Sequence, residues 1–460
     1  MKQTMKTPRY IVCLVVIASQ SVALPKVPTL HVKAFGAKGD GTTLDSPAIQ
    51  RAIDTAAASA TKAKVIVDPG KYLIGTIELK SGIELYLHPK ATLIISTNRE
   101  DYRYEAVIFA SNAVNISITG GGKILGRGLA FMTRYDPVGE WWIFGEWRPK
   151  MFILTACTNL TIRDITFGEA PFWGLHMLGC NHVLVEKVKI RNYLDVPNCD
   201  GIVADHCIDV TIRECDIRCG DDAIVIKTTR QPINFGPSAY IHVHDCTLET
   251  QDSALKIGTE TTEDVHDIVF EKCTVKNACR GLNIQVRDEG HVYNILFQNI
   301  KFVSRYHGDP WWGRGESISF TVIPRTPETH IGSISNVIVK NIFGVSENSA
   351  RICGMPNQPV RNVLFENVTL HVGRWTKYKG GVLDNRPTTV LQEIEPHDTA
   401  GILVRHAKDV TIKNCTVQWT KNIPIYYGPA IWITNASPIS IINFRGQSAN
   451  PHIYPDILIQ

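Results

Sequence analysis

A nine-residue pattern that recurs along the chain most constrains its fold. It reads NLTIRDITF at 159 and DVTIRECDI at 209, and its copies begin at residues 159, 182, 209, 240, 267, 294, 336, 362 and 409. Apolar residues occupy its second, fourth, seventh and ninth positions, which is strand alternation with one kink in the middle. A unit this short cannot bury its own apolar face, so neighbouring copies are expected to stack into a solenoid.

The spacing of the copies indicates the kind of solenoid. Six of the eight intervals are 23–31 residues long, and the other two are 42 and 47. Propeller blades repeat at about 40 residues, which is too long for this series. A period near 27 residues without helical segments predicts an all-β fold, a right-handed parallel β-helix with three sheets. The two long intervals are then ordinary coils that carry loop insertions.

The segment DSPAIQRAIDTAAASA (45–60) predicts an N-terminal capping helix over the first coil. Asp45 or Ser46 can cap the helix, and Pro47 suits its first turn. One apolar stripe is formed by Ile49, Ala52, Ile53 and Ala56. No linker or break in composition follows, so residues 24–460 are predicted to form a single β-helix catalytic domain.

The first 23 residues have the organisation of a secretory signal peptide. A basic start from Lys2 to Arg9 precedes the apolar run 11–18, and SVA at 21–23 offers a cleavage site. This run is too short to span a bilayer, and no later stretch is long and uncharged enough. We therefore expect residues 1–23 to be a signal peptide and the mature protein to be secreted or periplasmic, with no membrane span.

The charge balance excludes one class of partner. The chain has 48 basic and 44 acidic residues, and three of the basic ones lie in the leader, which leaves 45 against 44. A nucleic-acid binder would carry a basic stripe, so no nucleic-acid partner is expected.

The cysteines are predicted to be structural. The seventh position of the repeat is occupied by Cys215, Cys246, Cys273 and Cys415, which predicts a ladder of small buried residues. There is no CxxC and no His/Cys cluster with zinc spacing, so we predict no metal site and no cofactor.

Two neighbouring coils carry aspartates at the same position. VPNCDGIVAD and RCGDDAIVIKTT align when Ile202 and Ile224 are both core residues. Equivalent residues of adjacent coils stack about 4.8 Å apart. Asp200 is therefore expected beside Asp221 and Asp222, on one patch of the outer surface.

Three crowded carboxylates suit acid–base chemistry on a glycosidic bond. Like charges held close cannot all ionise, so one group keeps its proton near neutral pH. That acid can protonate a glycosidic oxygen while an ionised neighbour activates a water on the other face of the sugar. The spacing alone is also compatible with a polar turn between strands, or with a calcium site of a lyase or epimerase.

Three motifs in this order and spacing, PFWGLH at 171, PNCDGI at 197 and GDDAIVIK at 220, resemble glycoside hydrolase family 28. This family comprises the polygalacturonases and rhamnogalacturonan hydrolases. VKAFGAKGDGTTLDSPAIQRAID (32–54) is similar to the N-terminal segment of many pectin-acting β-helices, and the resemblance is strongest over 150–300. The resemblance implies an inverting hydrolase of α-glycosidic bonds. Its substrate would be a pectic poly- or oligosaccharide that contains galacturonic acid or rhamnose.

The resemblance also implies roles for individual residues. Asp221 would be the general acid, and Asp200 and Asp222 would hold and activate the water. Asn198 would orient the first aspartate motif and contact substrate. His176 matches a family position, where either a substrate contact or a buried structural role fits.

The chain differs from the polygalacturonases at the residues with which those enzymes bind a galacturonate carboxylate. Asn283 and Gln285 stand where those enzymes carry the two cations of Arg-Ile-Lys, and by that position they would contact the substrate. An amide does not replace a bidentate arginine. The cations that would take over the contact are Lys227, Lys256, Arg280 and Arg287. The two lysines are on strand positions expected to face outward beside the carboxylates, and a solvated surface charge is the alternative for all four.

These departures predict a substrate other than plain polygalacturonate, such as a rhamnogalacturonan-type backbone or a branched or terminal pectic sugar. Two insertions, at 135–149 and 305–316, are rich in aromatic residues. They would either contact sugars or close one end of the cleft, which would favour exo action. The alternative is that they pack on the β-helix or on a partner subunit. Two other functions stay open: a lyase or epimerase on this fold, and a non-catalytic carbohydrate-binding β-helix. The sequence does not fix the oligomeric state.

Overall fold

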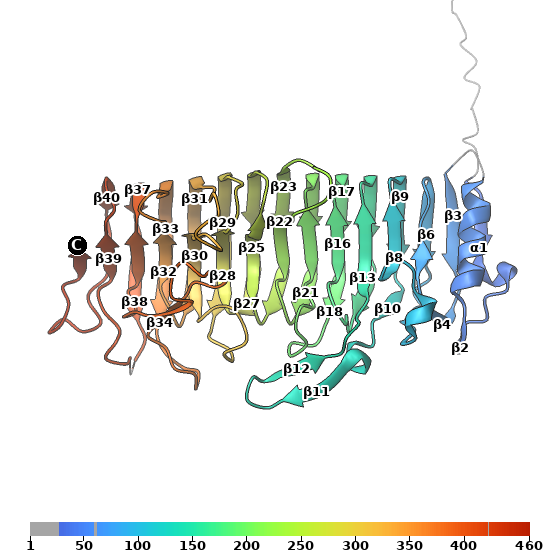
Figure 1. Cartoon of the computed structure of the whole chain (residues 1–460), viewed down its shortest axis with the longest axis horizontal. Helices are drawn as coiled ribbons and strands as arrows, with labels where there is room; N and C mark the ends of the chain where they lie inside the picture. The colour runs from blue at the N-terminus through green and yellow to red at the C-terminus, as the bar shows by residue number, and fades with distance from the viewer. Residues whose placement is uncertain (1–26, 59–61, 422) are drawn as a thin grey trace, which may run out of the picture.

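Parallel strands stacked coil upon coil form the predicted β-helix, which Figure 1 shows as an elongated solenoid. This computed structural model describes residues 27–58, 62–421 and 423–460. The expected signal peptide, residues 1–23, lies outside the described residues. Within the described ranges, no helix has the length and apolar character needed to cross a membrane.

Each central coil contributes three strands. In one coil these are β13 (Lys150–Thr155), β14 (Thr158–Arg163) and β15 (Thr166–Gly168). Strands equivalent to β13 pair with one another in a 13-stranded sheet, and the other two types join a 24-stranded sheet. The 13-stranded sheet consists, in chain order, of β5 (Ile77–Glu78), β8 (Ala106–Ser111), β13, β16 (Leu175–Leu178), β19 (Ile202–Asp205), β22 (Ile224–Thr228), β25 (Ser253–Thr261), β28 (Arg280–Val286), β30 (Glu316–Val322), β32 (Ala350–Cys353), β36 (Ile402–Arg405), β39 (Ile431–Thr434) and β41 (Ile457–Ile459).

The nine-residue repeat forms the other two strands of each coil and the corner between them. Its first and sixth residues have left-handed backbone conformations, as at Asn159 (φ 57°) and Asp164 (φ 62°). Asn and Asp tolerate this region better than most residues, which explains their frequency at these positions. Successive strands of the two types are β17 (Asn181–Glu186), β18 (Lys189–Arg191), β20 (Ile208–Arg213), β21 (Asp216–Cys219), β23 (Ser238–His244), β24 (Thr247–Thr250), β26 (Val265–Glu271) and β27 (Thr274–Ala278), and later copies run as single long strands, β29 (Val292–Ser304), β31 (Ile334–Ser346) and β33 (Val360–Val372).

The cysteines stack inside the solenoid, as the repeat predicts. All eleven cysteines of the described residues are free and buried. Cys215, Cys246 and Cys273 lie on successive coils with at most 1% of their surface exposed. They act as small apolar residues of the core, where a buried thiol packs much as an aliphatic group does.

Helix α1 (Ser46–Ala57) covers the N-terminal end of the stack, as expected (Figure 1). The predicted stripe is buried against the first coil: Ile49, Ala52, Ile53 and Ala56. The expected capping is wrong, because neither candidate side chain caps the helix. The Asp45 carboxylate accepts from the backbone N–H of Lys38 at 2.7 Å, and the Ser46 hydroxyl accepts from that of Gly75 at 2.7 Å. Both side chains therefore tie neighbouring loops to the helix start.

Two antiparallel hairpins depart from the regular coils. The first joins β11 (Met132–Asp136) to β12 (Trp141–Phe144), and the second joins β34 (Val382–Asp384) to β35 (Ile394–Pro396). The first falls within the insertion around 135–149, and the second within the longest interval between repeats. Both lie along the same side of the solenoid in Figure 1.

Candidate active site

The three predicted aspartates converge just before two neighbouring strands. Ile202 of β19 pairs with Ile224 of β22, which is the register that the sequence predicts. One oxygen each of Asp200, Asp221 and Asp222 lies within 4.8 Å of the others. All three line a cleft of about 300 Å³. Stacking of adjacent coils thus brings the carboxylates together, although Asp has a low propensity for β-strands.

Burial and repulsion favour the protonated form of part of this cluster. Burial is the largest cause that raises the pKa of Asp221 to about 8, and the charges of Asp200 and Asp222 add to it. Burial likewise raises the pKa of Asp200 to about 7. A carboxylic acid with a pKa near 8 is protonated at neutral pH and can donate its proton to a leaving group.

Asp222 has a cationic partner of its own. Lys256 Nζ lies 2.7 Å from Asp222 Oδ2, and the side chains of the two residues are 4% and 2% exposed. The backbone N–H of Ser253 donates to Asp222 Oδ1 at 3.3 Å. Three carboxylates this close could also hold a metal ion, but here an ammonium group of the chain already contacts one of them.

Asn198 acts on the cluster through its backbone. Its N–H donates to Asp221 Oδ2 at 3.1 Å, while its side-chain oxygen accepts from Arg148 Nη2 at 3.0 Å. The N–H of Asp222 donates to the other oxygen of Asp221 at 2.8 Å. These contacts fix the orientation of the Asp221 carboxyl group, and Asn198 also lines the cleft.

Lys227 lines the cleft beside the carboxylates, where the strand pattern places it. It is not a free cation, because its Nζ lies 3.1 Å from Glu260 Oε2 and 4.7 Å from the centre of the Trp173 ring. Burial alone would lower the pKa of this lysine, but the charges of Glu260 and Asp200 raise it overall. Lys227 is therefore charged at neutral pH.

His176 lies below the cleft wall. Its Nε2 is 3.2 Å from Asp205 Oδ2, and its Nδ1 is 3.2 Å from Lys150 Nζ. Burial lowers its pKa to about 4, so the ring is neutral over most of the pH range. With 5% of its surface exposed, His176 is buried, which favours the structural alternative over a substrate contact.

Four of the predicted substrate contacts are not at the cleft surface. The residues Arg280, Asn283, Gln285 and Arg287 are all 0% exposed. The physical reason is the hairpin of β34 and β35, which lies over their strand: Arg287 donates to the backbone oxygen of Asn385, and Gln285 to that of Arg386, both at 3.3 Å. Arg280 also donates to the backbone oxygen of Asp384, whereas Asn283 donates to Ser253 and Gln285. The prediction that these four residues contact substrate directly is therefore corrected: three support the hairpin, and Asn283 is buried beneath the cleft surface.

Aromatic side chains wall the cleft. They come from the two predicted insertions and from the PFWGLH motif: Trp141, Phe144, Trp173, Trp311 and Trp312. The two insertions meet, because the rings of Trp141 and Trp311 pack edge to face with centroids 5.8 Å apart. A third segment contacts the first insertion, since Lys377 and Tyr378 both contact Glu140. Trp141 and Trp311 thus pack on each other and also line the cleft.

The sequence reasoning missed a fourth cleft carboxyl group and its neighbours. Ile224 pairs with Leu255, so the same register extended by one coil places Asp252 beside Asp221. That rule was available from the sequence. Glu260, which lines the cleft, and Lys150, whose Nζ lies 3.9 Å from the centre of the Trp173 ring, both lie outside the three motifs, so no comparable signal pointed to either.

Asp252 gives a testable pH dependence of stability. Burial, with the charge of Asp222, raises its pKa from 3.8 to about 8. The unfolded chain ionises this group near pH 4 and the folded chain near pH 8, so its contribution to stability is lost as pH rises through that window. We expect Asp252→Asn to remove part of the wild-type decline between pH 5 and pH 9, on the order of a few kcal/mol, in urea unfolding at both values. Parallel declines in both proteins would contradict this assignment.

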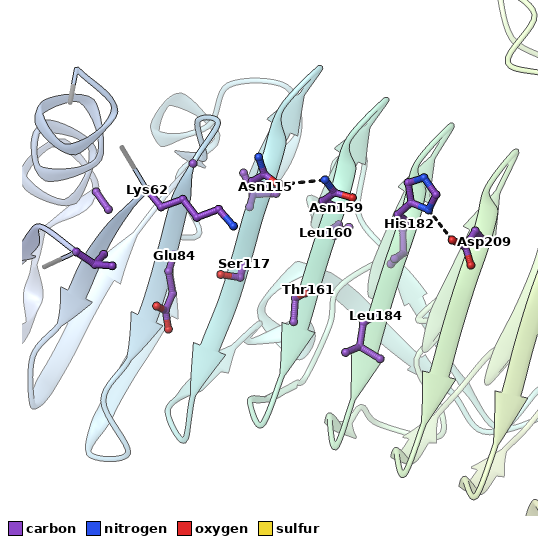
Figure 2. A pocket seen from close by; sticks show the side chains of 15 residues that line it. Lys62, Glu84, Asn115, Ser117, Asn159, Leu160, Thr161, His182, Leu184 and Asp209 are labelled. Carbon is purple, nitrogen blue, oxygen red and sulfur yellow. Dashed lines mark hydrogen bonds and ion pairs between the residues drawn. The ribbon is translucent and has the colours of Figure 1, made fainter. Parts of the chain in front are cut away.

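Another hollow, of about 490 Å³, lies on the 24-stranded sheet. Figure 2 shows that its lining side chains stand in rows along successive strands, with Asn159 bonded to Asn115 and His182 to Asp209. These are corner and surface positions of the repeat. Its carboxylates do not converge, so this hollow is a poor candidate for the chemistry.

Comparisons with known proteins agree with this geometry. The model of the family described as "Glycosyl hydrolases family 28" matches residues 58–382. The chain is 26% identical over 379 residues to a probable polygalacturonase of Vitis vinifera, covering 75% of this chain and 74% of that protein. Similar solved structures include an exopolygalacturonase of Thermotoga maritima (TM-score 0.61, 22% identity, 76% of this chain and 88% of that one) and a family 28 exopolygalacturonase of Yersinia enterocolitica (TM-score 0.65, 17% identity, 91% and 78%). At these identities the two structures establish the shared fold.

Proposed function

The chain belongs to glycosyl hydrolases family 28, an inverting family that acts on pectic substrates, and from this premise we propose that Asp221, Asp200 and Asp222 cleave an α-glycosidic bond of a pectic chain. One observation carries this assignment. Three carboxylates meet in one cleft, and Asp221 keeps its proton at neutral pH while Asp222 is paired with a lysine.

In the proposed reaction Asp221 donates its proton to the glycosidic oxygen as the bond from that oxygen to the anomeric carbon breaks. A water between Asp200 and Asp222 attacks the anomeric carbon from the opposite face and passes a proton to Asp222. The products are two sugars, one with an inverted anomeric centre. No cofactor takes part in these steps.

The cations of the cleft favour a substrate other than plain polygalacturonate. Lys227 and Lys256 line it, and each already contacts a carboxylate of the chain. The two arginines that the sequence offered for this contact, Arg280 and Arg287, are buried. We propose a rhamnogalacturonan-type backbone, or a branched or terminal pectic sugar, with fewer carboxylates to bind at the cleavage site.

The aromatic wall favours attack from a chain end. Three segments of the chain meet on one side of the cleft, through Trp141 with Trp311 and through Glu140 with Tyr378. A closed side limits how many sugars can lie beyond the cleaved bond. The two solved structures described above are named exopolygalacturonases, which is consistent with exo action. The predicted signal peptide favours a secreted or periplasmic enzyme.

Product analysis on a panel tests this proposal. Purified protein is incubated with polygalacturonate, rhamnogalacturonan and defined pectic oligosaccharides, and the earliest products are separated by size. We expect saturated mono- or disaccharides from chain ends, faster from a substrate other than polygalacturonate. An ultraviolet-absorbing unsaturated product that disappears with chelator would instead identify a lyase. Oligosaccharide binding without any product would identify a non-catalytic β-helix.

A further inference from the structure

Lys256 is buried against the carboxylate cluster. It belongs to β25, where it pairs with Val225 of β22, and its ammonium group lies 2.7 Å from Asp222 Oδ2. Only 3% of the residue is exposed. A buried ammonium group is costly unless it is paired and hydrogen-bonded, so this contact is required by the fold.

Asp221 and Asp222 are neighbours in sequence but have different partners. Asp221 accepts from two backbone N–H groups, those of Asn198 and Asp222. Asp222 accepts from the N–H of Ser253 and from Lys256. Backbone N–H donors and a contacting ammonium group both favour the ionised carboxylate, but only the ammonium group adds a full opposite charge. The pair is therefore chemically asymmetric.

We propose that Lys256 is a positioning residue for the hydrolysis: its ammonium group pairs with the Asp222 carboxylate and orients it as the group that accepts the water's proton, while Asp221 remains the acid. This role rests on the proposed function. Carboxylates have about two acceptor sites per oxygen, so Asp222 keeps capacity for a water after binding Lys256 and Ser253.

The geometry disfavours the other role considered for this lysine, recognition of a sugar carboxylate. Lys256 Nζ contacts Asp222, and the charge of Asp252 also acts on it. Although burial lowers the pKa of Lys256, these two charges raise it overall. A substrate carboxylate bound to Lys256 would lie close to the Asp222 carboxylate, and the two negative charges would repel each other.

The test compares Lys256→Met, Lys256→Arg and, as a control, Lys276→Met, which alters an exposed lysine of β27. The substrate is whichever member of the pectic panel the wild type cleaves fastest. We expect Lys256→Met to lose about 100-fold in kcat with KM changed less than threefold, and the acidic limb of its pH profile to move to higher pH. Lys256→Arg is expected to recover at least about tenfold, because a guanidinium group restores the ion pair.

Two outcomes would overturn the proposal. A rise in KM with kcat unchanged would identify Lys256 as a substrate reader and overturn the proposal. An unchanged pH profile with a low kcat would mean a structural role only, which also overturns it.

If the wild type cleaves nothing on the panel, the proposed function fails, and the pair is judged by thermal unfolding of Asp222→Asn, Lys256→Met and the double variant. If the double variant loses less in Tm than the two single variants lose together, the pairing of Asp222 with Lys256 is supported. Simple additivity contradicts it.

Discussion

Replacing Asp221 with asparagine is expected to lower kcat on the order of 10²–10⁴-fold, with KM changed only a few-fold. Asparagine keeps the shape of the side chain but carries no acidic proton, so it cannot protonate the leaving oxygen. The wild-type rate should also fall as pH rises through about 8, because burial and the neighbouring carboxylates place the pKa of Asp221 there. Initial rates of the variant and the wild type on the best panel substrate, from pH 4 to pH 10, measure both effects.

The matched control for this substitution is Asp216→Asn. Asp216 lies on β21, close in sequence, but it is exposed and pairs with Arg191 at the surface. We expect this variant to retain wild-type rates at every pH. Equal activity of Asp221→Asn and the wild type would remove Asp221 from the mechanism, and equal losses in both variants would point to a general effect on folding.

Much of the fold and of the carboxylate cluster could be predicted because both depend on local periodicity. The nine-residue repeat contains its own corner residues, and a parallel solenoid stacks like positions on like positions. Aligning Ile202 with Ile224 therefore sufficed to bring Asp200 beside Asp222, and the structure has that register. Asp252 follows from the same rule applied one coil further.

The surroundings of the cluster could not be predicted in the same way, because insertions make them. Nothing in the repeat indicates that the segment near 384 lies over β28, about a hundred residues earlier in the chain. For Arg280 and Arg287 the sequence offered a substrate contact or a solvated surface charge, whereas the hairpin buries both completely. The lysines were placed in the right cleft, but their partners, Glu260 and Asp222, depend on side-chain geometry that periodicity does not encode.

Replacing Asp384 with asparagine is expected to lower the free energy of unfolding by about 3–5 kcal/mol, because it leaves buried cations without their counter-charge. Asp384 is 0% exposed. Its carboxylate accepts from Arg386 Nε at 2.9 Å and Nη2 at 2.6 Å, and it lies 3.5 Å from Arg314 and 3.7 Å from Arg280. Although burial would raise its pKa, these arginines hold it far below the usual range. Urea unfolding at pH 7 measures the loss.

Asp216→Asn is again the matched control, because it removes an exposed ion pair and should cost no more than about 1 kcal/mol. The hairpin of β34 and β35 should also loosen in Asp384→Asn, so proteolysis between residues 374 and 398 should become faster than in either the control or the wild type. If the two asparagine variants lost equal stability, the arginines around Asp384 would not depend on its charge. Faster cleavage confined to this hairpin, with the coils intact, would instead show that Asp384 fastens the insertion that covers Arg280 and Arg287.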